Sequence, residues 1–166
     1  MRLLVAMLVA AGLLTGCGAA TPADPKPVAA AAVSDTLAFT GKTLDGAPFD
    51  AKTLAGKPTL LWFWAPWCAT CAGQASSIND LKAEYGDRLA ILGIAGMGKN
   101  KEMHEFVSDL GVGAVPNLDD EAGVLWKRFG ITEQSWFVLI DKSGKKLHTG
   151  WLDDVDLTAQ VKSLVA

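Results

Sequence analysis

The sequence predicts a three-layer α/β/α domain, in which helices cover both faces of a central sheet and a β-hairpin is added at the N-terminal side. Segment 59–64 is apolar without alternation, which is typical of a strand buried on both faces. A helical repeat follows and leads to a second apolar segment at 89–95, so a βαβ unit with parallel strands and a right-handed crossover is expected. Segments 136–140 and 145–149, joined by a turn at 141–144, add an antiparallel edge.

The hairpin ahead of the sheet is expected within residues 37–57. Its turn signal is Asp45-Gly46, which separates the extended segments 39–44 and 47–50. No internal repeat and no second folded domain can be recognised in the remainder of the sequence, so the predicted elements belong to one domain.

Four helices are predicted from apolar residues that recur at intervals of three and four. The first ends at Gly86 and carries Cys71, Ala75, Ile78, Leu81 and Tyr85. The second begins at the cap Asn100, is closed by Gly111 and carries Met103, Phe106, Val107 and Leu110. The third is short and runs from Asp119 or Asp120 to Phe129. The last begins at Asp153 or Asp154 and partly buries Val155, Ala159, Val161 and Val165.

The N-terminus has the pattern of an export signal with an anchoring cysteine. A short positive start precedes the apolar run 3–14, which is shorter than the roughly 20 residues that a spanning helix needs. The run ends in Leu14-Thr15-Gly16-Cys17, which resembles the lipobox of bacterial lipoproteins, where cleavage exposes the cysteine for acylation. Residues 1–17 are therefore predicted to be a lipoprotein signal peptide with lipidated Cys17. A secreted protein with a free Cys17, or a retained membrane helix, is the alternative.

Residues 18–35 are rich in alanine and proline and lack an amphipathic period. We interpret them as a tether that holds a folded domain, residues 36–166, away from the membrane. The domain is expected to lie outside the cytoplasm, anchored to the bacterial cell membrane. The space outside the cytoplasm is oxidising, so proteins there need disulfide chemistry.

The charge of the chain argues against binding to nucleic acid, and the number of cysteines leaves one pair for redox chemistry. The net charge is −3, with acidic and basic residues mixed along the chain, so no basic patch for nucleic acid is expected. The chain has three cysteines. With Cys17 assigned to lipid, Cys68 and Cys71 remain as a pair.

Cys68-Ala69-Thr70-Cys71 lies where a buried strand meets a helix. The spacing puts both sulfurs on one side of the first helical turn, close enough to bridge. Cys68 would face the unpaired N–H groups at the positive end of the helix, which favour the thiolate, and would be the exposed nucleophile. Cys71, one turn later, would be buried and would resolve the mixed disulfide. Pro66 and Trp67 would shape the rim.

Two other interpretations of the cysteine pair are weaker. A purely structural disulfide would close a very short loop and so gain little entropy. A zinc site would need two further ligands, and the two histidines, His104 and His148, have no ligand-like spacing. No metal and no cofactor other than the redox-active disulfide is therefore expected.

The motif in this context is similar to the thioredoxin superfamily, and most similar to its exported Dsb-type (DsbE/DsbF-like) lipoproteins and to the ResA/TlpA group. Further segments share the resemblance, which extends over residues 37–166: 39–46, 56–58, 118–123 and 137–144. It implies a thioredoxin fold and a thiol–disulfide oxidoreductase, with Cys68 as nucleophile and Cys71 as resolving cysteine.

Ser135 is a departure from the family, which places a cis-proline just before the strand that matches 136–140. The last proline of the chain is Pro116, so no neighbour can substitute. A cis bond before a non-proline costs about 2.5–4 kcal/mol. The loop therefore either stores that strain or runs trans with a changed shape. Because this family loop binds substrate, Gln134 and Ser135 are candidate substrate-binding residues, together with Ala69 and Thr70. A changed loop could also open the sulfurs to a metal or an iron–sulfur cluster.

The expected proton acceptors are also replaced. The strand residue that matches thioredoxin's buried aspartate is Trp62, and Gln74 stands where exported relatives carry glutamate three residues after the second cysteine. Trp62 and Trp64 are interpreted as core residues. Glu133 is the candidate acceptor for the Cys71 proton, because its loop should pass near the pair. Glu133 as a solvated residue, with water as a slower acceptor, is the alternative.

Three functions remain open from the sequence. The first is an oxidant of cysteine pairs in exported proteins that is served by a membrane redox partner, and the closest resemblance favours it. The second is a ResA-like reductant for cytochrome c maturation. The third is a binding or metal-holding module with little turnover. A peroxidase would need an arginine near the cysteine and a different motif, and a Sco-type copper chaperone would need a well-placed histidine.

Overall fold

The computed structural model describes residues 35–166, and the predicted signal peptide, Cys17 and nearly all of the tether lie outside this range. Seven strands and four α-helices follow one another in the described part, with short 3-10 turns between some of them. In chain order these are β1 Thr40–Lys42, β2 Pro48–Asp50, β3 Thr59–Trp64, α1 Ala69–Tyr85, β4 Ala90–Ala95, α2 Asn100–Leu110, β5 Asn117–Asp119, α3 Val124–Phe129, β6 Trp136–Ile140, β7 Lys146–Trp151 and α4 Asp154–Val165.

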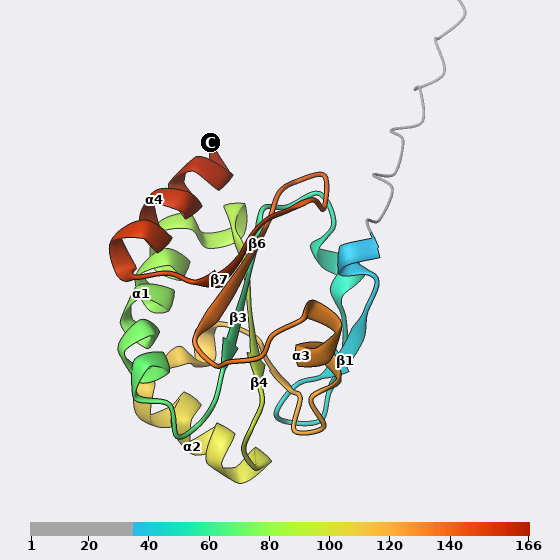
Figure 1. Ribbon diagram of the computed structural model, residues 1–166, viewed down its shortest axis with the longest axis vertical. Helices are drawn as coiled ribbons and strands as arrows, with labels where there is room; N and C mark the ends of the chain where they lie inside the picture. The colour runs from blue at the N-terminus through green and yellow to red at the C-terminus, as the bar shows by residue number, and fades with distance from the viewer. Residues whose placement is uncertain (1–34) are drawn as a thin grey trace, which may run out of the picture. The chain divides into compact units, whose positions relative to one another are not determined.

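The predicted three-layer α/β/α domain with an added hairpin is confirmed. The main sheet has the strand order β5-β4-β3-β6-β7, while β1 and β2 pair separately as an antiparallel hairpin. Strands β3, β4 and β5 are parallel, and β6 and β7 are antiparallel to their neighbours. Helices α1, α2 and α4 cover one face, and α3 with the hairpin covers the other (Figure 1). Strand β3 is central, and all six of its residues are buried because side chains on both its faces enter a core.

Some predicted elements differ in detail. Strand β5 was not predicted, since it has only three residues. Helix α3 begins at Val124, later than Asp119 or Asp120, because the Asp120 carboxylate accepts the N–H groups of residues 124, 125 and 126, which form the first turn. In α2 the cap is Lys99, and the Asn100 amide donates instead to the Leu44 carbonyl and to Asp119.

The buried face of α4 was predicted correctly in part. Val161 is buried and Val165 is partly buried, as predicted, but Val155 is 77% exposed and Ala159 is exposed, and the helix buries Leu157 and Leu164 instead. The Asp153 side chain caps the helix by accepting the Asp156 N–H at 2.8 Å, so the predicted start is also right. None of the helices in residues 35–166 has the length and apolar character that a membrane span requires.

Candidate active site

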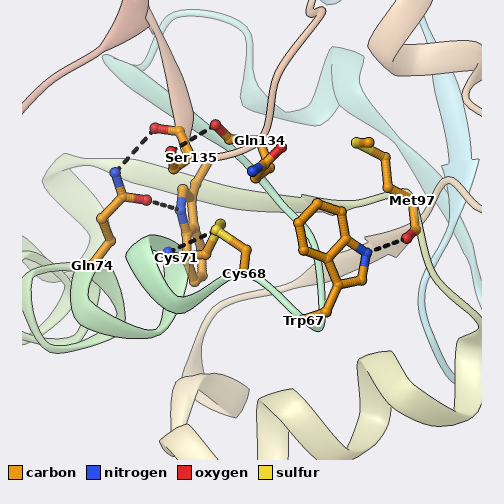
Figure 2. The surroundings of a disulfide bond; sticks show 8 residues. Trp67, Cys68, Cys71, Gln74, Met97, Gln134 and Ser135 are labelled. Carbon is orange, nitrogen blue, oxygen red and sulfur yellow. Dashed lines mark hydrogen bonds between the residues drawn. A yellow bond between two sulfur atoms is a disulfide. The ribbon is translucent and has the colours of Figure 1, made fainter.

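Cys68 and Cys71 lie where β3 passes into α1, and they form a disulfide (Figure 2). Cys68 is the N-cap residue of the helix, and its Sγ accepts the backbone N–H of Cys71 at 2.9 Å. The two Cα atoms are 5.2 Å apart, within the range that a disulfide spans. The sequence spacing thus places both sulfurs at the end of the helix where unpaired N–H groups favour a thiolate.

The two sulfurs differ in exposure, although less than expected. Cys71 is fully buried, as predicted, but Cys68 is only 4% exposed rather than open to solvent. Cys68 lines a groove of about 480 Å³ between the start of α1 and helix α2.

Trp67 forms the rim beside Cys68 and is held by a loop that the sequence analysis missed. Its ring is 58% exposed, while its indole N–H donates to the Met97 carbonyl at 2.7 Å (Figure 2). Met97 is half exposed and has a positive φ of 55°, which is unusual outside glycine. Gly98 packs so closely that an added Cβ would lie 2.3 Å from Pro66 Cγ. The signal was the Gly-Met-Gly run after β4, since loops at the carboxyl ends of parallel strands meet.

Gln74 connects three parts of the site and is itself buried. Its Oε1 accepts the Trp62 indole N–H at 2.9 Å, and its Nε2 donates to the Ser135 carbonyl at 3.0 Å (Figure 2). Trp62 and Trp64 are core residues, as interpreted, yet Trp62 also takes part in this chain of hydrogen bonds. Both polar ends of Gln74 are therefore engaged, and a neutral amide cannot accept a proton from Cys71.

Ser135 settles the backbone alternative that the sequence left open. No peptide bond within residues 35–166 is cis, and Ser135 has φ of 64°, so the loop runs trans with a left-handed residue. The Ser135 N–H donates to the Phe63 carbonyl at 2.9 Å, and its hydroxyl donates to the Gln134 carbonyl at 2.6 Å. The loop is thus tied to the end of β3 and to α1, next to the sulfur pair.

The other residues predicted for the site fall into two groups. Pro66 and Ala69 line the groove with Trp67, whereas Thr70 is exposed on the first turn of α1 and Gln134 is partly exposed beside Ser135. Glu133 is exposed on its loop.

Among residues 35–166, Asp120 is the sole buried carboxylate, and its oxygens are occupied by α3. No cluster of three or more metal-ligating side chains occurs in the same range.

The comparisons with known proteins agree with this geometry. A model of the thioredoxin-like family matches residues 56–146. The soluble secreted antigen MPT53 of Mycobacterium tuberculosis is 38% identical over 141 residues, which cover 85% of this chain and 76% of that protein. The thiol:disulfide interchange protein DsbE of Vibrio cholerae is 30% identical over 60% of this chain and 52% of its own length. The thiol–disulfide oxidoreductase ResA of Bacillus cereus is 27% identical over 64% of this chain and 62% of its own length.

Solved structures give the same result. Mycobacterial DsbF superposes with a TM-score of 0.74 at 36% identity, covering 80% of this chain and 98% of that one. A secreted disulfide oxidoreductase of Mycobacterium tuberculosis, described as homologous to E. coli DsbE, superposes with a TM-score of 0.71 at 35% identity, covering 79% and 100%. With its Cys68–Cys71 disulfide, the chain belongs to the thioredoxin-like family as a thiol–disulfide oxidoreductase of the Dsb/ResA type.

Proposed function

We propose that this oxidoreductase is exported, anchored to the bacterial membrane through Cys17, and oxidises cysteine pairs of exported proteins. The observation that carries the direction of electron flow is the hydrogen bond from the Cys71 N–H to Cys68 Sγ at the N-terminus of α1. This bond and the helix dipole stabilise a Cys68 thiolate, and stabilising the reduced form makes a disulfide a stronger oxidant.

The reaction then needs two exchange steps. A substrate thiolate attacks Cys68 Sγ, the Cys68–Cys71 bond breaks, and Cys71 leaves as a thiolate that takes up a proton. The second substrate thiolate attacks the substrate sulfur of the mixed disulfide, which forms the substrate disulfide and releases Cys68 as a thiolate. Two electrons have passed to the pair, and a disulfide-carrying membrane redox partner would take them up in turn.

The surrounding residues have proposed roles in these steps. Pro66, Trp67 and Ala69 would guide the substrate chain to Cys68, because they line the groove that leads to it. Thr70, Gln134 and Ser135 lie outside this groove and would contact the substrate chain elsewhere around the sulfur pair. Glu133 would accept the Cys71 proton when the membrane redox partner re-oxidises the pair, because Gln74 is a neutral amide with both ends engaged and Asp120 caps α3.

The proposed location rests on the sequence of residues 1–17. The name of the mycobacterial relative describes that protein as secreted, which supports export of this chain. A palmitate label that is incorporated by the native chain in cells, but not by the Cys17→Ala variant, would support the anchor. Incorporation that persists without Cys17 would overturn it.

A reductant of the ResA type is the second candidate, and the similarity to ResA favours it. The deciding experiment is the reduction potential of the Cys68–Cys71 pair in the full-length chain, measured in glutathione and dithiothreitol buffers. A value between about −120 and −200 mV is expected for an oxidant, whereas about −270 mV or below would assign the reductant role. If the disulfide does not form, both enzyme roles fail and a binding or metal-holding role remains.

A further inference from the structure

The groove beside Cys68 has walls of two chemical kinds. Its floor is apolar, because the buried or half-buried residues of its lining include Ala72 of α1 and Phe106 and Leu110 of α2, while the exposed Trp67 forms one edge. Its other edge is acidic and consists of Glu102, Glu105 and Asp109, all on α2. The spacing of three and then four residues places these carboxylates on one side of the helix. The groove thus joins an apolar floor to a row of negative charges, with Cys68 in its lining.

The nearby cations leave most of this negative charge uncompensated. Lys101 lies 3.4 Å from Glu105, but the two side chains are 87% and 58% exposed, so water screens the pair and a competing cation can replace it. The Lys99 ammonium bonds Glu121 at 2.6 Å and is committed mainly to that partner; this contact, together with the weaker attraction of Glu102, raises the pKa of Lys99. Within residues 35–166, neither Glu102 nor Asp109 has a cation at ion-pair distance.

The carboxylate of Glu102 is held in place by a hydrogen bond from the backbone. Its Oε2 accepts the Lys99 backbone N–H at 3.0 Å, which closes the capping box at the start of α2. The same atom lies 3.3 Å from the position that a Cβ on Gly98 would occupy, so the acidic edge begins at the loop that carries Met97. The acidic edge is therefore continuous with the rim that Trp67 and Met97 form beside Cys68.

From this arrangement we infer that the groove binds the stretch of substrate chain next to the reacting cysteine, and selects stretches in which a lysine or arginine accompanies an apolar residue. The apolar side chain would pack on Phe106 and Leu110, and the cation would lie along Glu105 and Asp109. The inference rests on the proposed function for the identity of the substrate as a cysteine-containing polypeptide. Beyond the proposed function, the inference specifies that the preferred substrate segment is positively charged.

Matched peptides test the preference. Two reduced dithiol peptides that differ only by Lys or Glu next to an apolar residue, two positions after the first cysteine, are mixed with the oxidised full-length chain in stopped flow. We expect the Lys peptide to react about tenfold faster in kcat/KM at low salt, since exposed charge contacts contribute about two- to fivefold each. The ratio should fall toward one as salt rises, because screening shortens the range of the charges to about 8 Å at physiological ionic strength.

Two double variants provide the comparison. Glu105→Gln with Asp109→Asn should bring the Lys-to-Glu ratio close to one. Glu84→Gln, at the exposed far end of α1, combined with Asp87→Asn, in the turn that follows the helix, removes the same charge and should leave the ratio unchanged. An equal reaction of the native chain with both peptides, or an equal loss of preference in both double variants, would overturn the inference.

A separate assay distinguishes a wrong inference about the groove from a wrong assignment of the enzyme role. Dithiothreitol oxidation by the same preparation reports the Cys68–Cys71 exchange alone, so peptides that react equally while dithiothreitol is oxidised contradict only the groove inference. If no thiol exchanges, the enzyme role fails, and the groove is tested by fluorescence anisotropy with the same peptides carrying serine for cysteine. A tighter binding of the Lys peptide supports the inference there, and equal binding contradicts it.

Discussion

The side-chain amide of Gln74 donates to the backbone carbonyl of Ser135 at 3.0 Å and ties the first helix to the loop that precedes β6. The same side chain accepts from Trp62 on β3, so one buried residue joins a strand, a helix and a loop around the sulfur pair. The group of Ser135 that takes part in this bond is its carbonyl oxygen, which can only accept, so residue 74 must supply a donor. This requirement explains why an amide, and not a carboxylate, suits this position in the chain.

The Gln74→Glu substitution tests that requirement. An ionised carboxylate could accept from Trp62 but would oppose the Ser135 carbonyl, whereas a protonated carboxyl could donate to it. The folded state should therefore raise the pKa of the new carboxyl above the unfolded value of about 4.3. With more protons bound in the folded state, stability falls as the pH rises through that window, and the variant should lose about 1–3 kcal/mol at pH 8.

Urea unfolding at pH 5 and pH 8 measures this loss relative to the native chain. Gln160→Glu, a partly exposed position on α4, is the control and should show no such difference between the two pH values. A Gln74→Glu protein that is equally stable at both pH values, relative to the native chain, would mean that the bond to Ser135 carries little free energy.

The backbone of Ser135 predicts opposite effects for two substitutions. A left-handed conformation costs an L-residue about 1–2 kcal/mol, while glycine loses about 0.5–1 kcal/mol more entropy on folding, so Ser135→Gly should stabilise the domain by about 0.5–1 kcal/mol. Ser135→Pro cannot adopt φ of 64° and removes the N–H that bonds Phe63, so it should cost about 3 kcal/mol or more. Denaturant midpoints order the three proteins, and a proline variant as stable as the native chain would contradict this view of the loop.

The sequence predicted the elements that local patterns specify. The unbroken apolar run of β3, the helical repeat beginning at Cys71 and the turn before β7 all identify their elements without knowledge of the partners. The strand β5 could not be predicted, because three residues give no periodicity. The hydrogen bond between Gln74 and Ser135 joins positions 61 residues apart, so no local pattern carries it. Likewise, no local pattern places the acidic side chains of α2 beside Cys68, because the two segments are brought together only by the fold.

Trp67 should affect substrate binding more than stability. Trp67→Phe removes the hydrogen bond to the Met97 carbonyl and part of the groove edge, but the ring is largely exposed. We expect a stability loss of about 0.5–1 kcal/mol, at the low end for one hydrogen bond, and a several-fold higher KM for cysteine-containing peptides. Trp151→Phe changes another exposed tryptophan, on the edge strand β7, and should leave KM unchanged. Equal KM changes in both variants would argue against a role for Trp67 in guiding substrate.

Burial of Cys71 predicts which intermediate accumulates when it is replaced. In Cys71→Ser the remaining Cys68 can still exchange with an oxidised substrate, but the resolving thiol is gone, so mixed disulfides through Cys68 should persist and turnover should be lost. In Cys68→Ser the buried Cys71 has no exposed surface, and few mixed disulfides should form. Mass spectrometry of protein isolated after acid quenching counts the adducts. Abundant adducts on Cys71 in the second variant would reverse the assigned roles.

Glu133 is the carboxylate to test for proton transfer to and from Cys71. With Gln74 engaged at both ends, the alternatives are this exposed side chain and water. A positioned acid or base contributes about 10²–10⁴-fold, but an exposed loop residue that competes with water should contribute less, so Glu133→Gln is expected to slow the resolving step about tenfold.

Single-turnover release of a preformed Cys68 mixed disulfide measures that step, and its pH profile should differ between the variant and the native chain. Glu84→Gln, on the exposed end of α1, is the matched control and should leave the rate and the profile unchanged. If Glu133→Gln leaves both unchanged as well, water accepts the proton and Glu133 is a solvated loop residue. A rate loss without a change in the pH profile would instead assign Glu133 to positioning of the loop.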